Sequence, residues 1–373
     1  MQFNGIPGFD DIKAHLKSTV TNNKVAHAQL FAGQEGAPVL AFAVAYANYL
    51  LCENKREEGA CGTCNACSKS MKYIHPDVQF IFPTVGTAQI PRKDALSYRF
   101  LKEWRSFLAN NPYSTVEEWT ASLGEEDKVA IIPIDESREI IKNITLKPFE
   151  AEIKIVIIWL PEEMAAPAAT ALLKVLEEPT GKCIFILATH EPDNLLTTIQ
   201  SRTQRLVIRK FSDQEIVDFL ISQYQIDEIK AKRLSHLSDG SIHMAKKLLQ
   251  DVDHNTHDWF RDWMRACFTF AATTQVDMAD QFGKMNKTMR KSVLDYGLSM
   301  MRETAISQTN PDLGRAEGED LKFANNFGKV MDIAKIEEVM NLMNDSIYHL
   351  ERNANARIEF LNLSLEITKT FKK

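Results

Sequence analysis

Four cysteines with close and regular spacing carry the strongest chemical signal in the sequence: Cys52, Cys61, Cys64 and Cys67. The C-x8-C-x2-C-x2-C pattern allows four thiolates to converge on one ion, and Gly62 permits the tight turn that this requires. Four thiolates fill a tetrahedral zinc site and leave no position open for a substrate. The pattern therefore predicts a structural Zn²⁺ site in a small module over residues 52–67, and it favours zinc over an iron–sulfur cluster.

Other interpretations of the same cysteines are open. A redox pair would use only two of the four thiols, and unligated thiols would leave their spacing unexplained. His75 could replace Cys52 as the fourth ligand, but it lies eight residues after Cys67, so a packing role is expected. A DNA-binding zinc finger is a further alternative, although basic and acidic residues are mixed around the cluster and no recognition helix is evident. Cys183 and Cys267 fit buried core positions.

A second candidate site is the stretch GQEGAPVL at residues 33–40, which follows an apolar run and precedes a helical pattern. A phosphate-binding loop of the form G-x-x-x-x-G-K-[ST] would occupy this place. Gly33 and Gly36 are present, but Pro38, Val39 and Leu40 stand where the second glycine, the lysine and the hydroxyl residue belong. Proline removes an amide donor, valine cannot meet phosphate charge and leucine cannot ligate magnesium. We expect a degenerate loop that binds no ATP.

The acidic residues that hold magnesium in such folds are also missing from their expected place. The apolar run Lys154–Leu160 ends in Trp159 and Leu160, where an acidic pair would stand. Glu162 and Glu163 follow directly, and only a shift in register would bring one of them into that role. Because both the phosphate-binding residues and the magnesium-binding carboxylate are missing from their expected positions, we expect no intrinsic catalysis.

The elements around these positions alternate between strands and helices in the first half of the chain. The apolar runs expected as strands are Ala28–Ala32, Lys154–Leu160, Cys183–Thr189 and Arg205–Ile208, and the helical patterns between them are Ala37–Leu51, Asp135–Thr145, Glu163–Glu177 and Asn194–Gln200. Near-continuous hydrophobicity suits strands that are covered on both faces, so the pattern predicts an α/β domain with a parallel sheet over residues 1–210. Residues 84–128 interrupt the alternation and are expected to form an insertion.

The inserted segment contains an amphipathic helix with large side chains along one side. They are Leu96, Phe100, Leu101, Trp104, Phe107 and Leu108. Such a stripe could contact a partner, but stripes of this kind more often form part of a core. We therefore expect this helix to cover its own domain.

The second half of the chain shows helical spacing and no further convincing strand. Residues 211–252 form a small helical unit, with Ser212 as a plausible N-cap for a helix to Gln223 and a second helix over Gly240–Leu249. Residues 253–373 contain the long amphipathic segments Met278–Thr304 and Ile333–Phe371, which favour a helical bundle.

Composition limits the partners and the compartment. The 373 residues carry 44 Lys and Arg against 50 Asp and Glu, a formal charge of −6, so no general positive field attracts nucleic acid or an anionic membrane. The first residues lack the apolar core of a signal peptide, and the longest uncharged stretch, residues 36–52, fits a buried helix better than a membrane span. We expect a cytoplasmic protein.

Several phrases together resemble one family. They are His27 to Gly33 (HAQLFAG), the cysteine module followed by His75-Pro76-Asp77, Ala171 to Pro179 (ALLKVLEEP) and Thr198 to Arg202 (TIQSR). Their types and order resemble the delta-prime subunits of the bacterial DNA polymerase III clamp loader, which are AAA+ proteins. The resemblance implies an AAA+-like α/β domain with an inserted zinc module, an all-α lid (211–252) and an all-α collar (253–373) used for oligomerisation.

The resemblance also implies a function in DNA replication. Such a subunit assembles with tau/gamma motor and delta subunits into a hetero-oligomer that loads the sliding clamp onto primer-template DNA. Arg202, in the phrase Ser201-Arg202-Thr203, would act in trans as an arginine finger on a neighbour's ATP, although Thr203 replaces the family's cysteine. Thr189 and His243 would stand at the two sensor positions, where a second-sensor arginine is replaced by histidine.

The sequence also leaves a different function open. An independent AAA+ ATPase with an unusual phosphate loop is the alternative. For Arg202 itself, the alternative to a finger is an ordinary surface ion pair.

Overall fold

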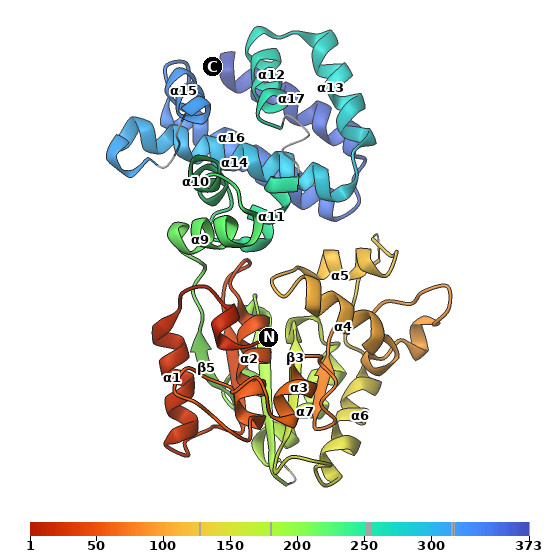
Figure 1. The fold of residues 1–373 in the computed structure, drawn as a ribbon. Coiled ribbons are helices and arrows are strands. Elements are labelled where there is room, and N and C mark those ends of the chain that lie inside the picture. The colour runs from red at the N-terminus through yellow and green to blue at the C-terminus, as the bar shows by residue number, and fades with distance from the viewer. Residues whose placement is uncertain (127, 180, 251–255, 315, 317, 373) are drawn as a thin grey trace. The chain divides into compact units, whose positions relative to one another are not determined.

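The computed structural model describes residues 1–126, 128–179, 181–250, 256–314, 316 and 318–372. The chain forms two compact units, one of residues 1–219 with 240–243 and the other of residues 220–239 with 244–373. The first unit contains all five strands of the described chain, and the second is helical (Figure 1). Within the described residues, no helix is both long and apolar enough to cross a membrane.

The first unit is built on a parallel sheet with the strand order β2-β3-β4-β1-β5. Its strands are β1 (Ala28–Ala32), β2 (Val78–Ile81), β3 (Lys154–Trp159), β4 (Cys183–Thr189) and β5 (Gln204–Val207). All four neighbouring pairs are parallel. Every residue of β1 and β4 is buried, as expected for central strands covered on both faces. The prediction of an α/β domain with a parallel sheet is confirmed.

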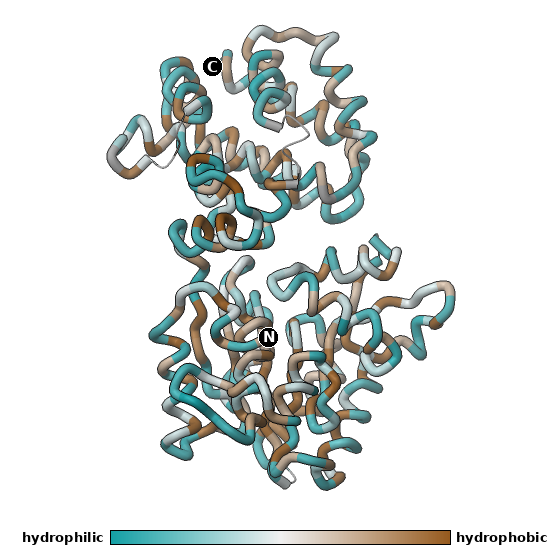
Figure 2. Tube along the Cα trace, in the orientation of Figure 1, coloured by the Kyte–Doolittle hydropathy of each residue, from teal (hydrophilic) through white to brown (hydrophobic). Residues whose placement is uncertain are grey.

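Helices cover both faces of this sheet. The helices of the first unit are α1 (Asp10–Thr21), α2 (Val39–Leu51), α3 (Asn65–Ser70), α4 (Leu101–Asn110), α5 (Val116–Ser122), α6 (Ile134–Thr145), α7 (Ala166–Glu177), α8 (Thr197–Gln200) and α9 (Asp213–Tyr224), whose last residues pass into the second unit. Ala28 and Leu30 of β1 pack with α6 and α7, whereas the ring of Phe31 meets Tyr46 of α2 on the other face. Figure 2 shows hydrophobic residues concentrated in the strands between these helices.

Short 3-10 helices connect several of these elements. They are η1 (Phe3–Gly5), η2 (Arg92–Asp94), η3 (Ser97–Phe100), η4 (Pro161–Glu163), η5 (Pro192–Asn194) and, in the second unit, η7 (Pro311–Leu313).

The inserted segment packs against its own domain, as its aromatic stripe predicts. Trp104 of α4 stacks on Phe82 with ring centroids 4.0 Å apart, and it also contacts Trp119 of α5 and Trp159 at the end of β3. All four rings are almost fully buried. Aromatic rings supply large buried areas, so this cluster fixes α4 and α5 to the sheet.

The second unit is a set of helices around one hydrophobic core. Its helices are α10 (Glu228–Leu237), α11 (Ile242–Gln250), α12 (Thr256–Thr269), α13 (Ala272–Lys284), α14 (Lys287–Thr309), α15 (Gly318–Phe327), α16 (Ile333–Glu351) and α17 (Ala356–Lys372). The first residues of α11 belong to the first unit. Trp263, Met343 and Phe360 are among the buried residues at the centre of this core. The all-helical prediction for the second half is confirmed.

The two long amphipathic segments predicted in this half each span two helices. Asn286 accepts a hydrogen bond from the Met289 amide at 2.8 Å and begins α14 as an N-cap, so α13 and α14 are separate helices. Asn353 adopts a left-handed backbone with φ 64° and separates α16 from α17. Asparagine favours both conformations because its short amide bonds to nearby backbone.

A buried polar network ties the helices of this unit together. Asp320 of α15, 2% exposed, accepts hydrogen bonds from Arg233 of α10 at 2.7 Å and from the Tyr296 hydroxyl of α14 at 2.9 Å. The Nδ1 atom of His257 lies 2.8 Å from the same carboxylate. Burial opposes ionisation of Asp320, but the hydrogen bonds from His257 and Arg233 outweigh it and lower its pKa.

Candidate functional site

The turn between β1 and α2 occupies the place of a phosphate loop, but its side chains point into the core. Val39 is fully buried and Leu40 is 4% exposed, so the positions of a lysine and a hydroxyl hold core residues. Gly33 is required by packing, because an added Cβ would lie 2.5 Å from the Ile208 carbonyl oxygen. Gly36 has a left-handed φ of 92°, and Pro38 lies directly before α2. This turn lacks the cation and hydroxyl that would bind a magnesium triphosphate.

The end of β3 holds aromatic and aliphatic side chains in place of metal-binding carboxylates. Trp159 is 1% exposed and packs against Trp104 and Phe107. Leu160 is also buried and adopts a left-handed backbone with φ 53°. An indole cannot ligate magnesium, so the position of the acidic pair has become part of the aromatic core.

Glu162 and Glu163 lie beyond the strand and have other environments. One Glu162 carboxylate oxygen accepts hydrogen bonds from the amides of His190 and Glu191, at 3.0 and 3.2 Å. Burial raises the pKa of Glu163, and the charges of Glu162, Glu191 and Glu117 raise it further. Glu162 therefore holds the loop that follows β4 in the structure.

Arg202 lies just after α8 and forms an ion pair within its own chain. Its Nε donates to the Glu177 carboxylate at 2.9 Å, and a terminal nitrogen donates to the Thr198 carbonyl oxygen at 3.1 Å. Its side chain is 31% exposed. The guanidinium is thus oriented at the surface between the end of α7 and α8.

The two sensor-like positions lie at the end of β4 and at the start of α11. Thr189 is fully buried at the end of β4, and its hydroxyl accepts a hydrogen bond from the Glu191 amide at 3.1 Å. The Nδ1 atom of His243 lies 3.3 Å from a Glu118 carboxylate oxygen of α5. Both residues make contacts within the first unit.

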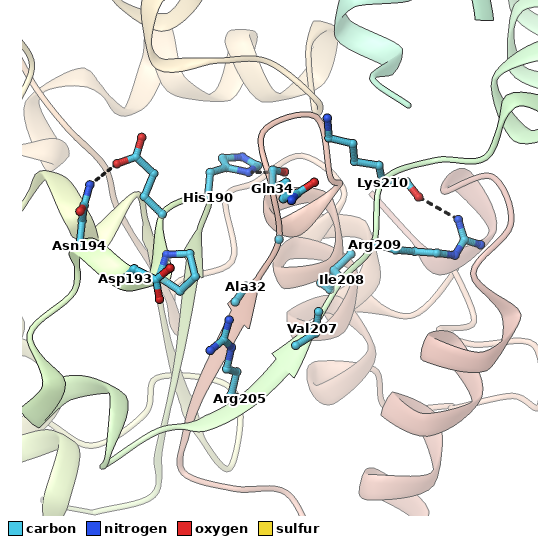
Figure 3. Close-up of a pocket in the computed structure, with 13 residues that line it drawn as sticks. Ala32, Gln34, His190, Asp193, Asn194, Arg205, Val207, Ile208, Arg209 and Lys210 are labelled. Carbon is cyan, nitrogen blue, oxygen red and sulfur yellow. Dashed lines mark hydrogen bonds between the residues drawn. The ribbon is translucent and has the colours of Figure 1, made fainter. Parts of the chain in front are cut away.

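An open cavity of about 690 Å³ lies beside these positions, at the carboxyl ends of β1, β4 and β5 (Figure 3). Residues of three segments line it: Ala32 to Gln34, His190 to Asn194, and Arg205 with Val207 to Lys210. Of residues 33–40, Gly33 and Gln34 reach it, so most of this turn lies outside the cavity. The cavity was not predicted from the sequence. The sequence feature that could have indicated the cavity is the polar edge strand β5, where Val207 is 64% exposed.

The four cysteines come together as the spacing predicts. The sulfur atoms of Cys52, Cys61, Cys64 and Cys67 all lie within 4.8 Å of one another, and all four residues are buried. The sulfurs of Cys61 and Cys67 are 3.9 Å apart. Zinc–sulfur bonds of about 2.3 Å in a tetrahedron require sulfur separations of about 3.8 Å, so the geometry fits this metal.

Backbone amides favour a thiolate at Cys61, whereas burial raises the pKa of Cys52 and of Cys67. Amides of Thr63 and Cys64 donate to the Cys61 sulfur at 3.5 and 3.3 Å, and they lower the pKa of Cys61 to about 5. The Cys61 amide donates to the Cys52 sulfur at 3.2 Å. Gly62 has a positive φ of 76° between the ligands. These four sulfurs would hold Zn²⁺, which would supply a crosslink within this module and no open coordination position.

The remaining candidates for metal binding have packing roles. His75 is buried, and its Nδ1 accepts a hydrogen bond from the Asp77 amide at 3.1 Å. Asp77 in turn accepts hydrogen bonds from the backbone amides of residues 149–151. Cys183 and Cys267 are buried core residues, as predicted.

Comparison with known proteins gives a consistent family. A family model described as "DNA polymerase III, delta subunit" matches residues 9–212, more than half of the chain. DNA polymerase III subunit tau of Bacillus subtilis (strain 168) is 26% identical over 256 residues, which cover 67% of this chain and 38% of that protein. DNA polymerase III subunit delta' of the same strain is 28% identical over 242 residues, covering 64% of this chain and 54% of that protein.

A third relative and two solved structures extend the comparison. DNA polymerase III subunit delta' of Pseudomonas aeruginosa is 29% identical over 177 residues, 48% of this chain and 41% of that protein. The chain thus spans 38–54% of the lengths of the three relatives. A gamma subunit-related protein of Thermotoga maritima MSB8 matches at 16% identity and a TM-score of 0.38, covering 95% of this chain and 99% of that one. The Bacillus subtilis DNA clamp loader delta protein matches at 10% identity and a TM-score of 0.30, covering 96% and 99%.

The match over residues 9–212 takes in the whole parallel sheet, the cysteine cluster and the turn at residues 33–40. The chain therefore belongs to the DNA polymerase III delta subunit family.

Proposed function

We propose that this chain is a delta-prime subunit of a DNA polymerase III clamp loader, and that it neither binds nor hydrolyses ATP. The observation that carries the proposal is the burial of Val39, Leu40 and Trp159, which fill the lysine, hydroxyl and magnesium-ligand positions of a nucleotide fold. The chain has the sheet of such a fold but apolar residues at these three positions. This combination suits a subunit that acts through its partners. The similarity to delta' proteins of two bacteria supports the same assignment.

In this proposal the chain assembles with tau/gamma motor and delta subunits in the cytoplasm, and the complex places a sliding clamp on primed DNA. Residues 1–210, 211–252 and 253–373 would serve as base, lid and collar. The boundary at 252 and 253 lies outside the described residues. Arg202 would supply its guanidinium to the ATP of a neighbouring subunit, where a fixed planar cation stabilises charge on the transferring phosphoryl group.

Reconstitution tests this function. The purified chain is mixed with motor and delta subunits, and the complex mass and DNA-stimulated ATPase rate are measured with and without it. We expect one defined complex that contains the chain, and an ATPase rate that depends on its presence. Failure to enter a complex of defined mass would refute the assignment.

The alternative is an independent ATPase with an unusual phosphate loop. Titration of the isolated chain with Mg-ATP discriminates between the two. We expect no saturable binding at millimolar nucleotide. Micromolar binding that is lost on Pro38→Ala or Glu162→Gln would favour the alternative.

A further inference from the structure

The inserted segment contains a short arm, residues 111–122, that reaches across the carboxyl edge of the sheet. The arm consists of Tyr113 with its neighbours and of α5 (Figure 1). The Tyr113 hydroxyl donates to the Gly5 carbonyl oxygen at 3.1 Å. Its ring meets Phe211 and Phe219 edge to face, with centroids 5.4 and 6.2 Å apart. One side chain thus joins the N-terminal loop to α9 and the segment before it.

Tyr113 completes a row of aromatic rings that begins in the first turn of α2. Phe42 meets Phe9 at 5.4 Å, and Phe9 meets Phe211 at 5.2 Å. Ligands of open α/β sheets bind outside the carboxyl ends of the strands, close to the first helix N-terminus. Here rings from the chain itself pack against the first turn of α2.

The other end of the arm contacts the segment that lies against the turn before α2. Glu118 of α5 lies 3.3 Å from His243. Two residues earlier, Ser241 packs so closely on Gly36 that an added Cβ on the glycine would lie 2.8 Å from the serine Cβ. The arm therefore contacts residues 240–243, and these residues cover the degenerate loop.

Glutamates gather beside the arm and oppose binding of a phosphate next to it, whereas Arg205, Arg209 and Lys210 line the neighbouring cavity. Glu117 on the arm adds to the negative charge of Glu162, Glu163 and Glu191, and burial together with these charges raises the pKa of Glu163. The two backbone amides after β4 already donate to the Glu162 carboxylate. The Glu162 carboxylate thus occupies two backbone amide donors. Together with the neighbouring glutamates it would repel an anionic ligand.

We propose that the arm is a built-in substitute for bound nucleotide: Tyr113 and Glu118 hold the N-terminal loop, the segment 211–219 and residues 240–243 together in one arrangement without any ligand. In a nucleotide-binding relative of this fold, a bound base and phosphates could bridge such segments. This inference rests on the proposed absence of ATP binding and goes beyond it, because it assigns a role to the inserted segment.

Hydrogen exchange followed by mass spectrometry tests the arm on the full-length chain. The variants are Tyr113→Ala, Tyr113→Phe and Glu118→Gln, with Tyr98→Ala as the matched control from the same inserted segment. Tyr98 is 52% exposed, and its recorded ring contact is with Arg99. Exchange is compared in residues 3–9, 211–219 and 240–243, and in the zinc module as an internal reference.

We expect Tyr113→Ala to accelerate exchange in residues 3–9 and 211–219 by at least about tenfold, since local opening there loses its bridging contact. Tyr113→Phe keeps the ring and should change exchange by less than about threefold. Glu118→Gln should accelerate exchange in residues 240–243, while Tyr98→Ala and the zinc module stay at wild-type rates.

Three results would overturn the inference. One is unchanged exchange at residues 3–9 and 211–219 in Tyr113→Ala. Another is an equal acceleration across the whole unit, which would mean general destabilisation. The third is protection of residues 33–40 in the wild-type chain by millimolar Mg-ATP, which would mean that the arm leaves the nucleotide region open. Protection by Mg-ATP would also count against the proposed function. The first two results would leave it standing, because assembly with partner subunits is a separate measurement.

Discussion

Arg202 and Glu177 form an ion pair in which Nε and one terminal nitrogen of the guanidinium each lie 2.9 Å from the same carboxylate oxygen. Glu177 is 60% exposed in this pair. Exposed pairs of this kind contribute only about 0–1 kcal/mol. A neighbouring phosphate could therefore compete with Glu177 for the guanidinium at small cost.

Substitution of Arg202 gives the first prediction. In the reconstituted complex, Arg202→Ala should slow ATP hydrolysis at the one neighbouring site by about 10³–10⁵-fold, because the transition-state cation is lost. Arg202→Lys should recover only part of the rate, since lysine lacks the planar fork. Single-turnover hydrolysis measures both, and Glu177→Gln is the control that should leave the rate at or above wild type. Equal rates for Arg202→Ala and wild type would exclude the finger role.

Metal content gives the second prediction. The purified chain should contain one Zn²⁺, and Cys64→Ser should lose it together with several degrees of thermal stability, because metal binding contributes to folding of the module. A colorimetric zinc assay after thiol modification measures the content. Cys183→Ser is the matched control: Cys183 is buried in β4 outside the cluster, so this variant should keep its zinc. Retention of a full equivalent by Cys64→Ser would contradict a four-cysteine site.

Glu136 gives a prediction on pH. It is 1% exposed in α6 and accepts the Ser97 amide at 2.8 Å, and burial raises its pKa to about 7. In the unfolded chain it should titrate near 4.3, so the folded state binds the proton more tightly. Its stabilising contribution is complete below about pH 4 and is lost as pH rises through 7.

Glu136→Gln removes this titration and keeps an oxygen acceptor for Ser97. The free energy of unfolding of the wild type, relative to the variant, should fall by on the order of 3 kcal/mol between pH 4 and 8. Chemical denaturation at four pH values measures this difference. A difference that stays flat with pH would show that the carboxyl group is not protonated in the fold.

The network around Asp320 gives the fourth prediction. Asp320→Ala should destabilise the second unit by about 2–3 kcal/mol, because Arg233 and Tyr296 lose a charged hydrogen-bond partner. Asp320→Asn should cost less, since it keeps one acceptor. The lowered pKa of Asp320 means that its contribution is present above the ordinary aspartate pKa and is lost as pH falls through the lower folded value. Thermal unfolding at neutral and acidic pH checks both statements.

Local patterns in the sequence predict much of this molecule. The runs that became β1, β3, β4 and β5 are continuous and apolar, and the cysteine spacing brings its own ligands together because all four lie within a few turns of chain. Strand β2 was missed. It has only four residues, two of them half-buried, so it lacks the long apolar run of a central strand. Helix α10 was missed because its pattern is short and highly charged.

Contacts between distant segments lay beyond local patterns. Nothing near Tyr113 indicates that its ring meets Phe211 and Phe219, because that contact depends on how the inserted segment folds back over the sheet. The cavity beside Arg205 likewise arises from three segments that are brought together only by the order of the strands. Such features follow from topology, which periodicity alone does not specify.

The buried Val39 also determines what a substitution at this position would cost in folding stability. A lysine restored there would place an ammonium group among core side chains, at a penalty of several kcal/mol, before any affinity for phosphate was gained. Trp159→Asp would likewise put a carboxylate into an aromatic core. Each of these single substitutions would therefore cost folding stability, and under the proposed function neither alone would restore nucleotide binding.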